Sequence, residues 1–126
     1  MFEVTVEQTF AAAHALREYK GKCENVHGHN YRVQVTVEGE KLNRIGLLVD
    51  FVDLKRVVRE VIGELDHQFI NELEPFTVLN PSAENMAKYL YDEVNERLSL
   101  NDPDAPARIS QIKVWETDTS IAVYRP

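Results

Sequence analysis

Cysteine and long apolar segments are scarce in this sequence, and basic residues are fewer than acidic ones; each of these features argues against a class of protein. The chain has one cysteine, Cys23, so no internal disulfide can form, which fits a reducing compartment. No stretch approaches the ~20 apolar residues that a membrane-spanning helix needs. The N-terminal segment alternates polar and apolar residues, unlike a signal peptide. We therefore expect a soluble, cytoplasmic protein.

Acidic residues outnumber basic ones by 21 to 14, and the formal net charge is −7. General binders of nucleic acids or anionic membranes are normally basic, so we expect neither as a main partner. A length of 126 residues, with 44% hydrophobic and 28% charged residues, is typical of one globular domain. We expect that domain to span residues 1–126.

Two segments in the first third of the chain alternate between apolar and polar residues, as half-buried strands do. They are Phe2–Phe10 and Asn30–Glu38. Between them, Ala11–Val26 has no clear period, and we predict a long loop there.

Two helices are predicted next. Asp50 is a candidate N-cap for the first, and apolar residues then recur at helical spacing. This apolar stripe consists of Leu54, Val57, Val58, Val61, Ile62 and Leu65. The second helix begins near Pro81, which suits a first helical position, with either Asn80 or Ser82 as the cap. Its apolar face consists of Ala83, Met86, Ala87, Leu90, Val94 and Leu98.

Two more strands, at about 108–116 and 120–125, follow a proline-containing loop at 99–107. The element order is therefore ββααββ. Runs of strands around paired helices are typical of an α+β domain. We predict an antiparallel sheet with two helices packed on one face.

Histidines carry the main functional signal. His27 and His29 are two positions apart, so their side chains share one face if strand geometry already holds there. An antiparallel pairing of the first two strands would bring His14 beside them. Three neutral imidazoles suit Zn²⁺ and leave its fourth tetrahedral position open for water or substrate. The alternative for each ring is an ordinary buried histidine.

Other reactive side chains lie near predicted element ends. Cys23 could be a nucleophile or base, a fourth zinc ligand, or a small buried apolar residue. Asp66 could orient His67 for proton transfer, or His67 could simply interact with a helix dipole. Glu116 shares a face with apolar residues, where it could accept paired N–H bonds from a ligand, or it could be solvated past the last buried position.

Six ordered blocks of this chain match a known family. They are Phe10–His14, Cys23–Tyr31, Val49–Phe51, Leu65–His67, Asn80–Asn85 and Val114–Thr117. Over nearly its whole length, the chain resembles the 6-pyruvoyl-tetrahydropterin synthase and 6-carboxy-tetrahydropterin synthase family. The resemblance implies the tunnelling fold (T-fold), in which ββααββ subunits form trimeric barrels that stack into a homohexamer, with active sites between subunits.

The resemblance also implies roles for individual residues. By motif position, the zinc ligands are His14, His27 and His29, and the catalytic thiol is Cys23. The matching blocks make Asp66 and His67 the partner dyad of that thiol, Glu116 the pterin anchor, and Glu84 a residue lining the pterin pocket. Ser82 stands where threonine is common in the family, and both can cap a helix.

The short Cys23-x-x-x-His27-Gly-His29 spacing resembles the bacterial and archaeal 6-carboxy-tetrahydropterin synthases of queuosine and deazapurine biosynthesis. The implied reaction is a lyase reaction that converts 7,8-dihydroneopterin triphosphate to 6-carboxy-5,6,7,8-tetrahydropterin, acetaldehyde and triphosphate. Elimination of triphosphate to give 6-pyruvoyl-tetrahydropterin is one alternative, and a non-catalytic zinc- and pterin-binding module is another. For the triphosphate, the candidates are Arg17, Lys20 and Lys22, which could equally form a solvated basic loop.

Overall fold

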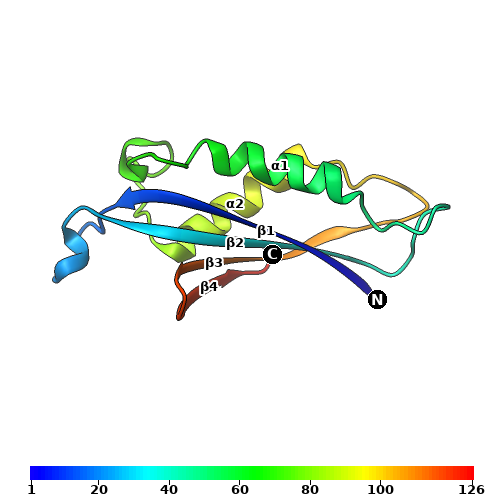
Figure 1. Cartoon of the computed structure of the whole chain (residues 1–126), viewed down its shortest axis with the longest axis horizontal. Helices are drawn as coiled ribbons and strands as arrows, with labels where there is room; N and C mark the ends of the chain where they lie inside the picture. The colour runs from blue at the N-terminus through cyan, green and yellow to red at the C-terminus, as the bar shows by residue number, and fades with distance from the viewer.

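The computed structural model describes residues 1–126 and contains one four-stranded sheet of order β1-β2-β3-β4, in which every neighbouring pair is antiparallel. The strands are β1 (Phe2–His14), β2 (His27–Gly39), β3 (Arg108–Thr117) and β4 (Ser120–Tyr124). The helices are α1 (Phe51–Gly63) and α2 (Ala83–Arg97), with 3-10 turns η1 (Lys22–Glu24) and η2 (Ile70–Glu72). Both helices lie on the same face of the sheet, as predicted (Figure 1).

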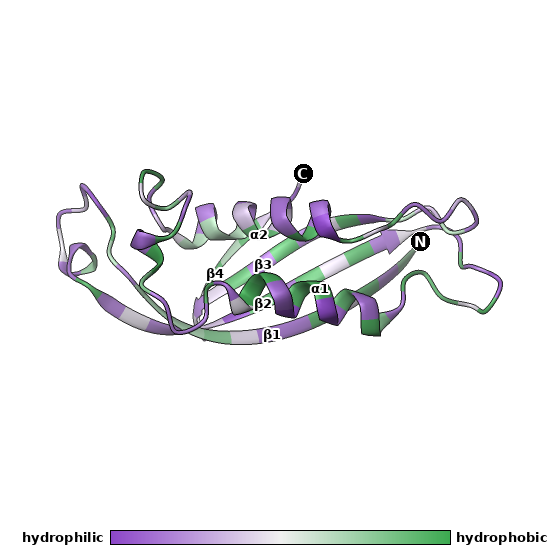
Figure 2. Ribbon diagram, turned by 90° about the horizontal axis from the view of Figure 1, so that it is seen from above, coloured by the Kyte–Doolittle hydropathy of each residue, from purple (hydrophilic) through white to green (hydrophobic).

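Each helix begins at a side-chain cap. The Val52 N–H donates to the Asp50 side chain at 2.8 Å, and the Asn85 N–H donates to the Ser82 hydroxyl at 3.2 Å. Ser82 is therefore the cap of α2, and Pro81 lies outside the helix. Figure 2 shows the helices lying across the strands, with hydrophilic residues frequent on their outward sides. Neither helix combines the length and apolar character needed to cross a bilayer.

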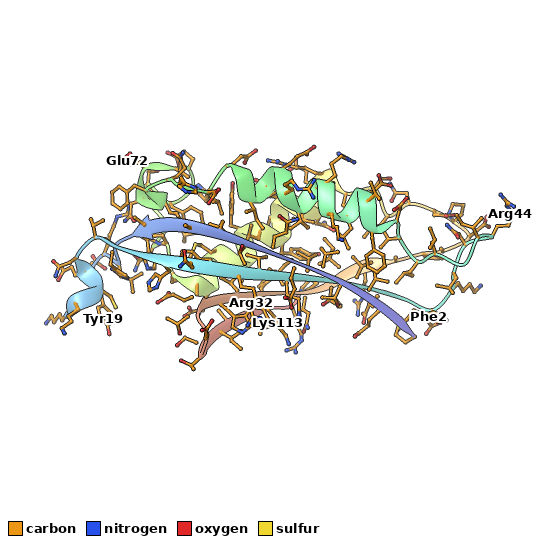
Figure 3. The ribbon with its side chains drawn as sticks, in the orientation of Figure 1. Phe2, Tyr19, Arg32, Arg44, Glu72 and Lys113 are labelled. Carbon is orange, nitrogen blue, oxygen red and sulfur yellow. The ribbon has the colours of Figure 1, made fainter.

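The core lies between the helices and the inner face of the sheet. The alternation predicted for the second strand is present, because Tyr31, Val33, Val35 and Val37 are all fully buried. The residues predicted as the apolar faces of both helices are buried against them. Polar side chains occupy the opposite face of the sheet, among them Arg32 and Lys113 (Figure 3).

The prediction of a loop over Ala11–Val26 was wrong for its first four residues, because β1 continues to His14. Three successive alanines give no contrast between the two faces of a strand, so periodicity fails there. Backbone pairing nevertheless continues, from Ala11 opposite Asn30 to His14 opposite His27. The segment after α1 supports the other edge of β1, since the Ala13 N–H donates to the Gln68 carbonyl at 3.0 Å. Because β1 and β2 are both longer than predicted, His14 and His27 lie on regular β backbone.

Candidate active site

Three histidines meet at one end of the sheet, as the antiparallel pairing predicted. His14 is the last residue of β1, His27 is the first of β2, and the two are register partners. His29 follows on the same face, and one ring nitrogen from each histidine lies within 4.8 Å of the others. The ring centroids are 4.6 to 5.0 Å apart and the rings meet edge to face.

The protonation of two of these rings is set by main-chain carbonyls. His14 Nδ1 lies 2.7 Å from the Pro81 oxygen, and His27 Nδ1 lies 2.7 Å from the Asn25 oxygen. A carbonyl only accepts, so each Nδ1 must carry the proton, and a neutral ring then has a bare lone pair at Nε2. The two Nε2 atoms face each other at 3.0 Å. Two lone pairs cannot form a hydrogen bond, whereas a shared cation satisfies both.

His29 completes this donor set. Its Nε2 and the Tyr31 hydroxyl are the two buried side-chain polar atoms without a hydrogen-bond partner in the protein. Burial lowers the pKa of His14 and of His29, which favours the neutral ring that can ligate a metal. The three rings therefore fit a metal ion that prefers imidazole nitrogen.

Cys23 lies outside the ligand set. It sits on η1, is partly exposed, and its thiol sulfur is not among the clustered donor atoms. The Leu16 N–H donates to the Cys23 carbonyl at 2.8 Å, which ties η1 to the chain leaving β1. The alternative in which Cys23 is a fourth zinc ligand finds no support in this geometry, and the candidate ligands are the three histidines.

Asp66 and His67 form the predicted pair. Asp66 Oδ1 accepts from the Ala11 N–H at 3.0 Å and lies 3.0 Å from His67 Nδ1. The Ala11 N–H, followed by His67, lowers the pKa of Asp66. His67 lies beyond the end of α1 and pairs with Asp66, which argues against the helix-dipole alternative.

His67, the histidine of the Asp66–His67 pair, is exposed to solvent. His67 has a positive φ of 59°, and its side chain is 81% exposed. A non-glycine residue in this strained region is often found at functional sites. It borders a cavity of about 500 Å³ that His29 also lines. No hydrogen bond joins the dyad to Cys23 within the chain.

Glu116 and Glu84 line one cavity of about 400 Å³, between the start of α2 and the β3–β4 turn. Glu116 comes from the end of β3, and its Oε1 lies 3.4 Å from His29 Nε2. The cavity therefore opens beside the histidine cluster. The structure brings both predicted pterin-site carboxylates to one side of the candidate metal centre.

The fold and this site can be compared with known proteins. A family profile described as 6-pyruvoyl tetrahydropterin synthase matches residues 3–126. The chain belongs to this family. The family resemblance predicted from the sequence blocks is confirmed, and with it the enzyme class of the tetrahydropterin synthases.

Individual members of the family resemble the chain over nearly its whole length. A Bacillus subtilis (strain 168) protein named 6-carboxy-5,6,7,8-tetrahydropterin synthase is 39% identical over 130 residues, covering 99% of this chain and 86% of that protein. A Poecilia reticulata protein named 6-pyruvoyl tetrahydrobiopterin synthase is 35% identical over 136 residues, covering 97% and 78%. The structure of Caenorhabditis elegans 6-pyruvoyl tetrahydropterin synthase superposes with a TM-score of 0.83 at 28% identity, covering 100% and 97%. The predicted T-fold subunit is thereby confirmed.

Some residues that support this candidate site were not predicted from the sequence. The carbonyls of Asn25 and Pro81 orient two histidines, but a carbonyl has no signature in a sequence. Arg17, predicted as one candidate for the triphosphate, also holds a loop: its guanidinium donates to the carbonyls of Phe76 at 2.7 Å and Leu79 at 3.2 Å. The assignment of Arg17, Lys20 and Lys22 to the triphosphate stays a prediction.

Proposed function

We propose that this protein is a zinc-dependent 6-carboxy-5,6,7,8-tetrahydropterin synthase. It converts 7,8-dihydroneopterin triphosphate and one water to 6-carboxy-5,6,7,8-tetrahydropterin, acetaldehyde and triphosphate, as a step of queuosine or other deazapurine biosynthesis. The observation that carries the proposal is the convergence of nitrogens from His14, His27 and His29 in a chain of this family. The short spacing from Cys23 to His27 and the full-length similarity to the Bacillus subtilis protein favour the 6-carboxy product.

His14, His27 and His29 would hold the zinc ion through three nitrogens and leave a position for substrate oxygen. Zinc, when bound, supplies a Lewis acid that stabilises negative charge developing on the side-chain oxygens of the substrate. The chain contributes the geometry. Two of the rings are already oriented by main-chain carbonyls, so few rearrangements are needed on binding.

Cys23 and His67 are the groups that transfer protons. Cys23, as thiolate, removes the proton from the side-chain carbon next to the pterin ring. His67, oriented by Asp66 at 3.0 Å, is the second proton carrier of the carbon–carbon cleavage. An aspartate on Nδ1 leaves Nε2 as the exchanging nitrogen and stabilises the cation that forms when the ring takes up a proton.

Glu116 recognises the pterin. A carboxylate can accept two parallel N–H bonds from a ring N–H and the adjacent exocyclic amine, and this pairing fixes the orientation as well as the affinity. Its place beside His29 would direct the substrate side chain toward the metal. Glu84, across the same cavity, is a second acceptor for the pterin edge.

Each active site is completed between subunits of a homohexamer built as a dimer of trimers. The support is the exposure of His67 and the absence of a hydrogen bond between the dyad and Cys23. A thiol and a dyad that share no hydrogen bond within one chain can serve one substrate when a neighbouring subunit supplies the second group.

Incubation of the purified zinc-loaded protein with dihydroneopterin triphosphate tests the proposal. We expect acetaldehyde and 6-carboxy-tetrahydropterin in equal amounts. Cys23→Ala should retain zinc and lose nearly all turnover, whereas His27→Ala should lose the metal. A pyruvoyl product without acetaldehyde would identify the alternative synthase. Binding of the pterin without any turnover would identify a non-catalytic module, and full activity of Cys23→Ala would remove the thiol from the mechanism.

A further inference from the structure

Two asparagine side chains clamp the chain that leaves β1. The Ala15 N–H donates to Asn71 Oδ1 at 2.9 Å, and Asn71 Nδ2 donates to the Ala15 carbonyl at 2.8 Å. The Arg17 N–H donates to Asn80 Oδ1 at 2.9 Å, and Asn80 Nδ2 donates to the Arg17 carbonyl at 3.2 Å. Each carboxamide makes the pair of bonds that a neighbouring strand would make. The two side chains thus act as a substitute strand for Ala15 and Arg17.

The clamp joins two loops at the histidine end of the sheet. Figure 3 labels Tyr19 in one loop and Glu72 in the other, both at that end of the molecule. The middle residue of the clamped segment, Leu16, donates its N–H to the Cys23 carbonyl. The same short segment therefore connects the clamp to His14 on one side and to the loop of Cys23 on the other.

Asn80 is also anchored through its own backbone. Asn85, in the first turn of α2, donates from Nδ2 to the Asn80 carbonyl at 2.9 Å. The next residue, Pro81, offers the carbonyl that holds His14 Nδ1 at 2.7 Å. Asn80 thus lies one residue from the acceptor of a metal ligand, and its side chain holds the backbone three residues beyond that ligand.

We infer that Asn80 is a positioning residue for the metal centre, with Asn71 in a supporting role. By tying the Arg17 backbone to the residue before Pro81, Asn80 keeps the Pro81 carbonyl on His14 Nδ1 and so keeps the His14 Nε2 lone pair directed at the metal. Outer hydrogen-bond partners of metal ligands typically contribute 10–100-fold in affinity. The inference rests on the proposed metal site.

Zinc affinity of the full-length apo protein, measured by competition with a chromophoric chelator, tests the inference. Asn80→Ala should bind zinc about 10-fold more weakly than wild type, at the low end of that range, because Pro81 and not Asn80 is the direct partner of His14. Asn71→Ala should show a smaller loss, because Asn71 does not belong to the segment that supplies the Pro81 carbonyl. Asn101→Ala is the matched control, since Asn101 is an exposed loop asparagine whose side chain makes no hydrogen bond in the protein, and it should bind zinc like wild type.

Melting temperatures of the apo variants separate this role from simple loop attachment. All affinities are measured well below the melting temperature of each variant. An Asn80→Ala protein that melts earlier but binds zinc as tightly as wild type would overturn the inference while leaving the proposed function intact. A wild type that binds no zinc would overturn both.

A second variant covers the case in which Asn80→Ala does not fold. Asn80→Asp keeps the acceptor for the Arg17 N–H but loses the donor to the Arg17 carbonyl. It should therefore bind zinc more weakly than wild type. Where Asn80→Ala does fold, Asn80→Asp should bind zinc more tightly than that variant. Wild-type affinity in Asn80→Asp would then contradict the inference.

Discussion

The chemistry of the histidine cluster depends on which nitrogen of each ring carries the proton. Main-chain carbonyls fix this choice for His14 and His27, and the 3.0 Å separation of their Nε2 atoms is suited to a bound cation. Carbonyl acceptors also make the ligating nitrogen more basic. The carboxylate of Asp66 fixes which nitrogen of His67 carries the proton, and the Ala11 N–H holds that carboxylate in place.

Asp66→Asn should show that the contacts of Asp66 stabilise the fold only when its carboxyl group is charged. The pKa of this carboxyl is lowered in the fold by the Ala11 N–H and by His67, so its stabilising contribution is present above the ordinary carboxyl pKa. That contribution is lost as the pH falls through the lowered value. Urea unfolding should therefore show wild type more stable than Asp66→Asn at neutral pH, with the difference shrinking in acid.

Asp118→Asn is the control for this pH dependence. Asp118 is exposed in the β3–β4 turn and its side chain makes no hydrogen bond or ion pair in the protein, so its substitution should change the free energy of unfolding little at any pH. A stability difference for Asp66→Asn that stays constant from neutral to acidic pH would contradict the role of the carboxylate charge.

Among the elements, those with a strong apolar period could be predicted from sequence. The alternation around Val33 and Val35 identified β2, and the helical stripe after Asp50 identified α1, because each buries one side against the core. The meeting of His14 with His27 followed from antiparallel pairing alone. Ala11–His14 was missed, since small residues carry no period and the pairing with the segment after α1 holds that part of the strand.

Contacts between a side chain and a distant backbone group could not be predicted. Asn80 meets Arg17 across 63 positions, and His14 meets the Pro81 carbonyl across 67. Neither contact leaves a periodic pattern, because the acceptor or donor in the backbone is the same for every residue type. The outer part of the site therefore required coordinates, whereas two of the three candidate ligands, His27 and His29, were visible as a His-x-His pair.

Two glycines at element ends should respond oppositely to alanine. A Cβ on Gly39, at the end of β2, would lie 2.5 Å from Leu48 Cδ1 and 2.6 Å from the Pro106 carbonyl oxygen. The Leu48 methyl can move but the backbone oxygen cannot do so easily, so Gly39→Ala should lower the free energy of unfolding by about 1–3 kcal/mol.

Gly63→Ala is the matched comparison. Gly63 ends α1 and a Cβ there would meet no atom within 4 Å. Alanine should raise the free energy of unfolding by up to about 1 kcal/mol, because it restricts the unfolded chain and favours helix. Urea unfolding measures both variants. Equal tolerance of the two substitutions would contradict the close packing described where β2 meets the loop before β3.

At the scale of the whole molecule, the proposed assembly predicts that different subunits complete one site. Cys23→Ala and His67→Ala homo-oligomers should each be inactive. Co-assembled in equal amounts, they should recover roughly a quarter of wild-type activity, because random mixing leaves that share of sites with both groups intact. The measurement is acetaldehyde release after refolding the two variants together.

Mixing Cys23→Ala with His27→Ala provides the control. The proposed catalytic thiol and the proposed metal ligands belong to one chain, linked through Leu16 and His14, so no mixed site would contain both. Activity should stay absent in this pairing. Recovery here, or no recovery in the Cys23 and His67 pairing, would contradict a site shared between subunits in the proposed way.

X-ray absorption at the zinc edge of the loaded protein tests whether three histidines hold a metal that stays open to substrate. We expect nitrogen and oxygen neighbours alone, at about 2.0–2.1 Å, with three imidazoles and one exchangeable oxygen. A sulfur neighbour at about 2.3 Å would show that Cys23 closes the fourth position, and it would contradict a metal open to substrate with a free thiol beside it.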